Sequence, residues 1–321
     1  MVSSPSSNPK ISTPLVYFGT DELSPIILSQ LIEGSWNIKA VVTKPDAPKG
    51  RTLEMSEPAV KQIAKAHNIK VFQPEKLRDI EPELKDLQAP IGVLVAYGKI
   101  IPESILNLFP YGIINVHPSL LPKYRGSSPI EQALLHGDSE TGVTIIRLIK
   151  EMDAGPIYAT EKFKLSDEDT QQNVYPRIGK VGGELLIKTL PRILSGELEP
   201  SEQDEKSVSL APLINKQDSH IDWANETADE IARKVRAFNR WPQSRATITL
   251  PEDQSLDVVI TLAKTHKGTA TRNSSPGRVS YSDKRLLIEA KDGFVEILSL
   301  KVPGKKEISG QEFAAGYIPK V

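Results

Sequence analysis

The chain has 321 residues, of which 39% are hydrophobic and 25% charged, and its formal net charge is −1. This length accommodates two domains with separate cores, and the composition is that of a folded globular protein rather than a disordered one. The chain contains no cysteine, which excludes disulfide bonds, thiolate catalysis and cysteine-ligated zinc.

Residues 1–13 are rich in serine and proline and contain no apolar core, so we expect a disordered tail rather than a secretory signal. The same stretch has no arginine and is therefore a poor mitochondrial transit peptide. No apolar run in the chain approaches the roughly 20 residues that span a bilayer. We therefore expect a cytoplasmic protein without a membrane partner.

From Leu15 onward, short runs rich in valine and isoleucine alternate with helical patterns. The predicted strands are 15–18, 38–42, 70–72, 91–96, 113–116, 143–149 and 157–164, and the predicted helices are 24–32, 58–67 and 170–194. Such an alternation predicts an α/β domain with a doubly wound, mostly parallel sheet over 14–194, whose ligand crevice lies at the carboxyl ends of the strands. The first turn has one glycine, Gly19, where a dinucleotide fold has three, so we expect no nicotinamide or flavin cofactor.

The polar, acidic stretch 195–208 is typical of a linker. A helical pattern over 226–238 follows, and then short strands with glycine-containing turns at 256–263, 278–281, 286–290 and 295–302. This pattern predicts a small antiparallel β-barrel, OB-like, as a second domain over 209–321.

Asn115 and His117 lie two residues apart at the end of the predicted strand 113–116, so both side chains point to one face near the crevice. An amide and an imidazole that converge there suit the stabilisation of an oxyanion at a carbonyl group under attack. Asp153 follows the strand 143–149, and the turn permitted by Gly155 would leave its carboxylate at the same edge, beside the imidazole. On spacing alone, a purely structural role for these three residues stays open, because a strand-end histidine is often structural and the other two residues suit ordinary turns.

The chain from Leu15 to its C-terminus resembles the methionyl-tRNA formyltransferase family. The resemblance is carried by Asn115-x-His117-x-Ser119-Leu120-Leu121-Pro122, Tyr124-Arg125-Gly126, Gly142-Val143-Thr144 and Asp153-x-Gly155, and, past the linker, by Ile221-Asp222-Trp223 and 236–242. It implies that Asn115, His117 and Asp153 are catalytic and that 10-formyltetrahydrofolate is the formyl donor, with no metal.

The resemblance also implies which residues contact the substrates. Ser119, Leu120, Leu121 and Pro122 would contact the folate, and Val95, Ala96 and Tyr97 would border its pteridine pocket. Lys49 and Arg51 would approach the acceptor end of methionyl initiator tRNA, although Thr52-Leu53-Glu54 after Arg51 makes this loop less basic than is usual in the family. The resemblance also suggests a monomer.

The second domain would help to hold the tRNA. Within 264–306 there are 10 Lys and Arg against 4 Asp and Glu, a local basic bias that is equally compatible with a solvated surface. We expect Trp223 and Trp241 to pack in a core or between domains rather than to stack on bases.

Three other functions remain open. A formyltransferase acting on an amino sugar or on glycinamide ribonucleotide would share the catalytic domain, and so would a hydrolase that releases formate from the folate. A non-catalytic RNA-binding module is the alternative from a different class, and the Asn, His and Asp set argues against it.

Overall fold

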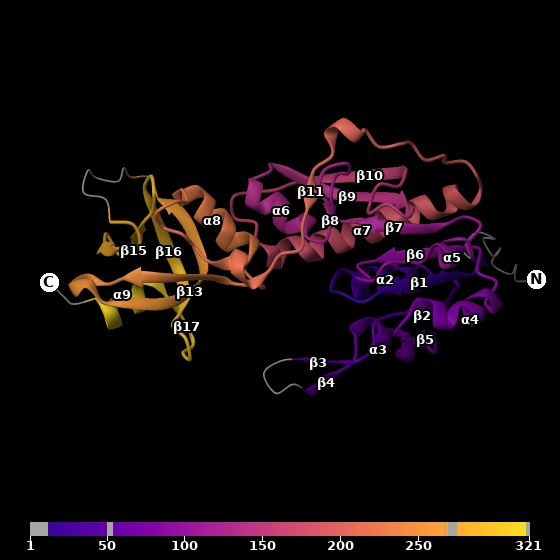
Figure 1. Cartoon of the computed structure of the whole chain (residues 1–321), viewed down its shortest axis with the longest axis horizontal. Coiled ribbons are helices and arrows are strands. Elements are labelled where there is room, and N and C mark those ends of the chain that lie inside the picture. The colour runs from indigo at the N-terminus through magenta and orange to yellow at the C-terminus, as the bar shows by residue number, and fades with distance from the viewer. Residues whose placement is uncertain (1–11, 50–53, 267, 269–274, 319–321) are drawn as a thin grey trace, which may run out of the picture. The chain divides into compact units, whose positions relative to one another are not determined.

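The computed structural model describes residues 12–49, 54–266, 268 and 275–318 (Figure 1). Most of the predicted tail, residues 1–11, lies outside the described residues, as does Arg51. The chain divides into two compact units. Unit 1 comprises Met1–Pro129, Glu140–Lys164 and Tyr175–Ala211, and unit 2 comprises Ile130–Ser139, Leu165–Val174 and Pro212–Val321.

Unit 1 is built around a seven-stranded sheet of order β10-β9-β7-β6-β1-β2-β5. Its strands are β1 (Leu15–Gly19), β2 (Ile38–Val42), β5 (Lys70–Phe72), β6 (Ile91–Val95), β7 (Ile113–His117), β9 (Glu140–Arg147) and β10 (Ile157–Lys164). The five strands from β7 to β5 are parallel. At the β7 side of the sheet, β9 runs antiparallel to β7, and β10 runs antiparallel to β9, in the direction of the other five. The predicted mostly parallel sheet is therefore confirmed. The chain leaves β1 toward β2 and returns to β6 on the other side, so the switch point lies between β1 and β6.

Helices cover both faces of this sheet. They are α2 (Leu23–Glu33), α3 (Ala59–Ala66), η1 (Leu77–Ile80), α4 (Glu81–Asp86), α5 (Glu103–Leu106) and most of α7 (Gln171–Leu194). Unit 1 also contains the short 3-10 turn η2 (Glu205–Ser207), which has no buried residue. Along β1 the burial is complete on both sides, because Phe18 packs in a cluster with Leu77 and Ile105 while the hydroxyl of Tyr17 donates to the Ser24 carbonyl of α2. Two-sided burial explains why these strands read as continuous apolar runs.

Two small strand pairs complete unit 1. A hairpin joins β3 (Ala47–Lys49) to β4 (Glu54–Ser56), and a parallel pair joins β8 (Arg125–Gly126) to β11 (Leu210–Ala211). Neither was predicted from the sequence. Each is two or three residues long, too short for a periodic pattern to show.

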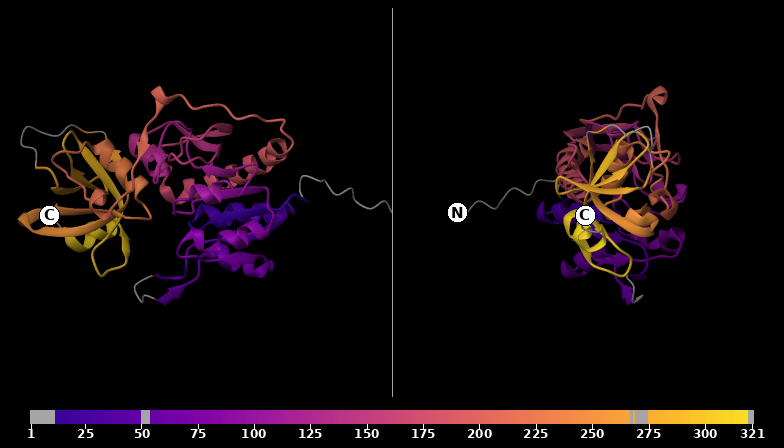
Figure 2. Two further views of the ribbon diagram at one scale, coloured as in Figure 1. Left: turned by 45° about the vertical axis from the view of Figure 1, so that its right-hand side comes forward. Right: turned by 90° about the vertical axis from the view of Figure 1, so that its left-hand side faces the viewer.

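Unit 2 is an antiparallel sheet of order β12-β13-β16-β15-β14, with β17 added to β16 (Figure 2). Its elements are α6 (Pro129–His136), η3 (Lys216–Ser219), α8 (Ala228–Ala237), β12 (Ser244–Thr249), η4 (Pro251–Asp253), β13 (Ser255–His266), β14 (Val279–Ser282), β15 (Arg285–Glu289), β16 (Phe294–Lys301), β17 (Glu307–Ser309) and α9 (Gly310–Tyr317). The edge strands β12 and β14 meet through a parallel bridge between Thr249 and Arg278, which closes the sheet toward a barrel. The predicted antiparallel second domain is confirmed.

The two tryptophans of unit 2 differ in their surroundings. Trp223 is buried in the core of this unit and its Nε1 donates to the Thr247 carbonyl oxygen at 3.0 Å, as the packing interpretation predicted. Trp241 is 50% exposed, so it is not a core residue. Its sequence neighbours are turn residues, and a turn leaves the side chain without a covering element.

Candidate active site

Asn115 and His117 lie at the carboxyl end of β7 and are 5% and 3% exposed. Val116 between them points toward α7, where a Cβ at Gly182 would lie 3.0 Å from its Cγ1. Because side chains alternate along a strand, Asn115 and His117 share the opposite face. The structure thus brings these two predicted site residues together.

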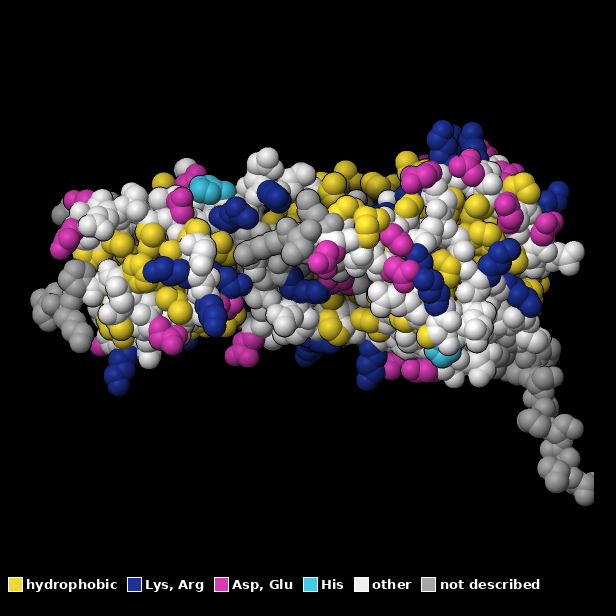
Figure 3. Space-filling model, turned by 90° about the horizontal axis from the view of Figure 1, so that it is seen from below, with side chains coloured by type: hydrophobic (Ala, Val, Ile, Leu, Met, Phe, Trp, Pro, Cys, Tyr) yellow, Lys and Arg dark blue, Asp and Glu magenta, His cyan; other side chains and the backbone are white. Residues whose placement is uncertain are grey.

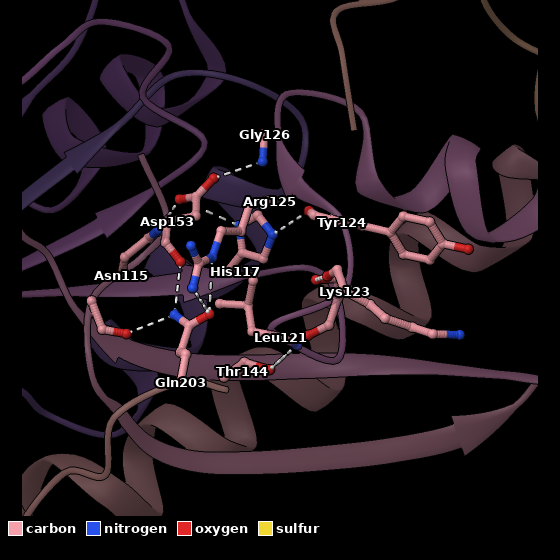
Figure 4. A network of polar contacts seen from close by, with 12 residues as sticks. Asn115, His117, Leu121, Lys123, Tyr124, Arg125, Gly126, Thr144, Asp153 and Gln203 are labelled. Carbon is pink, nitrogen blue, oxygen red and sulfur yellow. Dashed lines mark hydrogen bonds and ion pairs between the residues drawn. The ribbon is translucent and has the colours of Figure 1, made fainter. Parts of the chain in front are cut away.

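Asp153 joins them from the loop that follows β9 (Figure 4). Its Oδ1 accepts a hydrogen bond from Asn115 Nδ2 at 3.3 Å and lies 3.6 Å from His117 Nδ1. Its Oδ2 accepts from the backbone N–H of Gly126 at 2.9 Å. All three residues predicted to be catalytic are therefore in one cluster.

The predicted route of Asp153 to the cluster is wrong. The strand ends at Arg147 rather than at 149 and runs antiparallel to β7, with Arg147 opposite Ile114. The strand end therefore points away from the carboxyl edge, and the loop 148–156 returns the carboxylate to it. Strand direction is set by partners far away in the sequence, so the local pattern could not predict it.

His117 has an oxygen atom beside each ring nitrogen. Nε2 lies 3.0 Å from the Tyr124 carbonyl oxygen, which can only accept, so Nε2 carries a hydrogen. Nδ1 faces the carboxylate of Asp153. The 3.6 Å between Nδ1 and Asp153 Oδ1 is longer than a hydrogen bond, so Nδ1 lies close to the carboxylate without being hydrogen-bonded to it.

The predicted folate loop packs tightly beside the cluster. The hydroxyl of Ser119, a fully buried residue, donates to the Lys123 carbonyl oxygen at 2.6 Å. Thr144 on β9 then ties the loop to the sheet, because its Oγ1 donates to the Ser119 carbonyl oxygen at 2.7 Å and accepts from the Leu121 N–H at 3.1 Å. The peptide bond between Leu121 and Pro122 is cis. Leu120 is half-buried against Gly142.

The residues predicted to border the pteridine pocket follow β6. Val95 is fully buried, and Ala96 has a φ of 44° with its carbonyl oxygen accepting from the Asp21 N–H at 3.1 Å. Tyr97 is 1% exposed, packs edge-on against Phe18, and has no hydrogen-bond partner for its hydroxyl among the described residues. Burial raises the pKa of Tyr97 to about 12. Within the described chain, no hydrogen bond or ring contact joins these three residues to the Asn115 cluster.

The predicted tRNA loop is only partly described. Lys49 is the last residue of β3, and Arg51 lies outside the described residues. The base of the loop is held by Asp46, whose Oδ2 lies 2.7 Å from Lys61 Nζ and whose Oδ1 accepts from Gln73 Nε2 at 2.7 Å. The contacts of Lys49 and Arg51 with tRNA stay predictions.

The basic residues predicted to face tRNA in unit 2 are partly paired with acids. Glu296 lies 3.4 Å from Lys264 Nζ and 3.9 Å from Arg285 Nε, and Lys301 lies 3.3 Å from Glu307. On the face shown in Figure 3, basic and acidic side chains are interspersed. The basic bias of the sequence is therefore reduced locally by ion pairs.

Sequence reasoning missed one group at this site. Gln203 and Glu205, in the stretch predicted to be a linker, both contact the guanidinium of Arg125, which is 7% exposed. The hydrogen bond from Arg125 holds the pKa of the Glu205 carboxyl below its ordinary value. The only sequence signal was the Tyr124-Arg125-Gly126 motif, which does not identify its partner.

Two further structural features bear on cofactors and location. In the described part of the chain, no three His, Asp or Glu side chains are grouped closely enough to hold a metal ion. No helix among residues 12–318, outside the gaps given above, has the length and apolar character of a membrane span.

Comparison with known proteins decides the family. Residues 15–190 match the family model described as formyl transferase, and residues 213–318 match the formyl transferase C-terminal domain. The chain is 35% identical to methionyl-tRNA formyltransferase from Sulfurihydrogenibium sp. and 38% identical to that from Dictyoglomus thermophilum, over 94% of its length and 96% of each relative. The chain belongs to the methionyl-tRNA formyltransferase family. The predicted family and the predicted class of enzyme, a formyltransferase, are confirmed.

Solved structures of other proteins share the fold of this methionyl-tRNA formyltransferase family member. An N-formyltransferase from Helicobacter canadensis, in complex with folinic acid and dTDP-3-aminofucose, superposes with a TM-score of 0.66 at 21% identity and covers 89% of this chain and 98% of its own. HypX from Aquifex aeolicus, in complex with tetrahydrofolic acid, gives a TM-score of 0.63 at 17% identity over 97% of this chain and 49% of its own. At these identities the likeness concerns the fold.

Proposed function

We propose that this enzyme transfers the formyl group of 10-formyltetrahydrofolate to the α-amino group of methionyl initiator tRNA. The observation that carries the proposal is the cluster of buried Asn115 and His117 with the partly buried Asp153. Relatives named methionyl-tRNA formyltransferase match both units of the chain, which supports a charged tRNA as the acceptor.

The donor groups of the cluster fit a formyl carbonyl. Asn115 uses one amide hydrogen on Asp153 and has a second one for a ligand oxygen. His117 Nδ1 lies 3.6 Å from the Asp153 carboxylate, too long for a hydrogen bond, so its N–H is available to the same oxygen. Both side chains are buried, which strengthens their interaction with developing charge.

The reaction then proceeds without a covalent enzyme intermediate. The methionyl ammonium gives a proton to the Asp153 carboxylate, and the free amine attacks the formyl carbon. Asn115 and His117 stabilise the oxyanion of the tetrahedral intermediate. The bond from carbon to N10 breaks, and the proton from the attacking amine passes to N10. Formylmethionyl-tRNA and tetrahydrofolate leave, and Asp153 releases to solvent the proton that it took from the ammonium.

The test is a transfer assay with labelled 10-formyltetrahydrofolate and four acceptors: methionyl initiator tRNA, free methionine, an amino-sugar nucleotide and water. We expect label to reach the charged tRNA alone. Label on the sugar, or released as formate, would show that the acceptor is the sugar or water. The proposed role of the catalytic cluster would then still stand. Absence of turnover with every acceptor would contradict the enzyme assignment and favour an RNA-binding module.

A further inference from the structure

Residues 201–211, which we call the strap, run across the candidate active site within unit 1. At one end Ser201 and Ile157 exchange backbone hydrogen bonds of 2.8 and 2.7 Å. At the other end β11 pairs with β8, the strand that contains Arg125 and Gly126. Most of this segment was predicted to be a linker, yet both of its ends are bound to the loops of the site.

Gln203 is the buried centre of the strap, 8% exposed, and uses its whole amide (Figure 4). Its Nε2 donates to the carbonyl oxygens of Asp153 at 2.8 Å and Gly155 at 2.7 Å. Its Oε1 accepts from Arg125 Nε at 3.0 Å and Nη2 at 2.9 Å. One side chain therefore links the turn that carries Asp153 to the loop that carries Arg125.

The turn around Asp153 needs such support. Asp153 has a φ of 50°, in the left-handed region that is unfavourable for a non-glycine residue. Gly155 packs so closely on the Arg147 carbonyl group that an added Cβ would overlap it. A strained turn persists when surrounding contacts hold it, and Gln203 bonds the carbonyl oxygens of both Asp153 and Gly155.

The strap also holds the backbone that faces the cluster. Ser209 accepts from the Tyr124 N–H through Oγ at 3.0 Å and from the Arg125 N–H through its carbonyl oxygen at 2.9 Å. These bonds fix the segment whose Tyr124 carbonyl oxygen lies beside His117 Nε2 and whose Gly126 N–H donates to Asp153 Oδ2. Two of the three cluster residues are therefore oriented by groups that the strap holds.

We propose that Gln203 is a positioning residue for formyl transfer: through the Asp153 turn and Arg125 it holds the carboxylate in its reactive place. The inference rests on the proposed function of the cluster, but not on the identity of the acceptor. Glu205 supports Gln203 from the solvent side, because its Oε1 lies 2.7 Å from Arg125 Nη2 while its side chain is 72% exposed.

The experiment compares Gln203→Glu with the wild type in steady-state transfer assays. The carboxylate of the variant still accepts from Arg125 but has no N–H for the Asp153 and Gly155 carbonyl oxygens. We expect kcat to fall about 10- to 100-fold, as for a misplaced catalytic group. KM for both substrates should change less than about threefold, because Gln203 touches neither in the proposed reaction.

A second readout needs no substrate. Hydrogen exchange of the backbone amides over 150–156 should speed up in Gln203→Glu, while exchange over β1, β6 and β7 stays as in the wild type. The exchange measurement distinguishes the two proposals. If the wild type transferred no formyl group to the charged tRNA, the proposed acceptor would be wrong, but the exchange test of the strap could still be carried out.

The matched control is Gln172→Glu, the same substitution on an exposed side chain with no described hydrogen bond, and it should leave kcat and exchange unchanged. If Gln203→Glu unfolds at a markedly lower temperature than the wild type, Gln203→Asn can replace it. This variant keeps the amide but withdraws it by one methylene, and the same fall in kcat is expected. A kcat within twofold of the wild type in a folded variant, or a rise in KM alone, would overturn the positioning role.

Discussion

Asp153 is the residue whose contacts define the chemistry of the site. Its two carboxylate oxygens have different surroundings. Oδ2 accepts from the Gly126 N–H, whereas Oδ1 faces Asn115 and His117. In the proposed reaction, an incoming ammonium would meet a carboxylate whose Oδ2 is held by Gly126 and whose Oδ1 faces the cluster. This arrangement suits proton acceptance from the attacking amine.

Replacing Asp153 with asparagine keeps the shape of the side chain and removes its charge. We expect turnover to fall on the order of a hundredfold or more, because the amide cannot accept the ammonium proton. Steady-state assays across pH would measure it. Unchanged turnover with an unchanged pH profile would show that Asp153 handles no proton.

Tyr97 provides a test of stability at the same scale. Its hydroxyl is buried without a described partner, so Tyr97→Phe should keep the free energy of unfolding or raise it by up to about 1 kcal/mol. Its pKa of about 12 in the folded state exceeds the ordinary value near 10. The unfolded chain therefore loses this proton first, and wild-type stability should fall as pH rises from about 10 to about 12.

Urea unfolding at pH 8 and near pH 11 would measure both effects of Tyr97→Phe. The phenylalanine variant should lose less stability than the wild type between these two values. An equal loss would mean that the Tyr97 hydroxyl does not contribute to alkaline unfolding. Tyr17, whose pKa burial also raises, is present in both proteins and cancels in the comparison.

At the scale of elements, the sequence was informative where turn residues bound a strand-like run. The strands at 38–42, 70–72 and 157–164 have the predicted bounds, because a glycine, proline or polar residue stands within two positions of each end. The orientation of β9 and the pairing of β8 with β11 were not predictable, because both depend on partners distant in sequence. The role of Gln203 could not be predicted for the same reason, because its four hydrogen bonds all join it to residues at least 48 positions earlier in the chain.

The pairing of β8 with β11 can be tested at Gly126. Its φ is 128°, and a Cβ there would overlap the Ala211 carbonyl oxygen. Gly126→Ala should cost roughly 1–3 kcal/mol of stability and lower kcat, because the N–H that donates to Asp153 is displaced. Denaturant unfolding and the transfer assay together would measure these effects.

Gly304→Ala is the control for that variant, since Gly304 has a φ of 80° with open space around it. Gly304→Ala should lose stability only through the unfavourable backbone conformation, and its kcat should stay as in the wild type. Equal losses of stability at both positions, with full activity in Gly126→Ala, would contradict a role for the β8 and β11 pair in the site.

At the scale of the whole molecule, compact units do not follow sequence order. Residues 130–139 and 165–174 belong to unit 2 although they precede the predicted linker, and 195–211 belong to unit 1. Composition marked 195–208 as a linker because it is polar, but polar residues also form buried hydrogen bonds when a charged partner such as Arg125 faces them.

Binding of the tRNA is the property in which the two units would act together. Affinity should fall steeply with salt, since each phosphate contact releases counterions. Arg51→Ala should raise KM for the charged tRNA and reduce the slope of log affinity against log salt by about 1. A slope equal to that of the wild type would mean that Arg51 does not contact a tRNA phosphate.

The central claim is that Asn115 and His117 stabilise the transition state of formyl transfer, and single-turnover transfer to methionyl initiator tRNA tests it most directly. Asn115→Ala and His117→Ala, each shown to be folded by thermal unfolding, would be compared with the wild type at saturating substrates. We predict that the rate falls on the order of a hundredfold or more in each variant, because a preorganised donor contributes about 3–4 kcal/mol. A loss of less than about threefold at both positions would contradict the account.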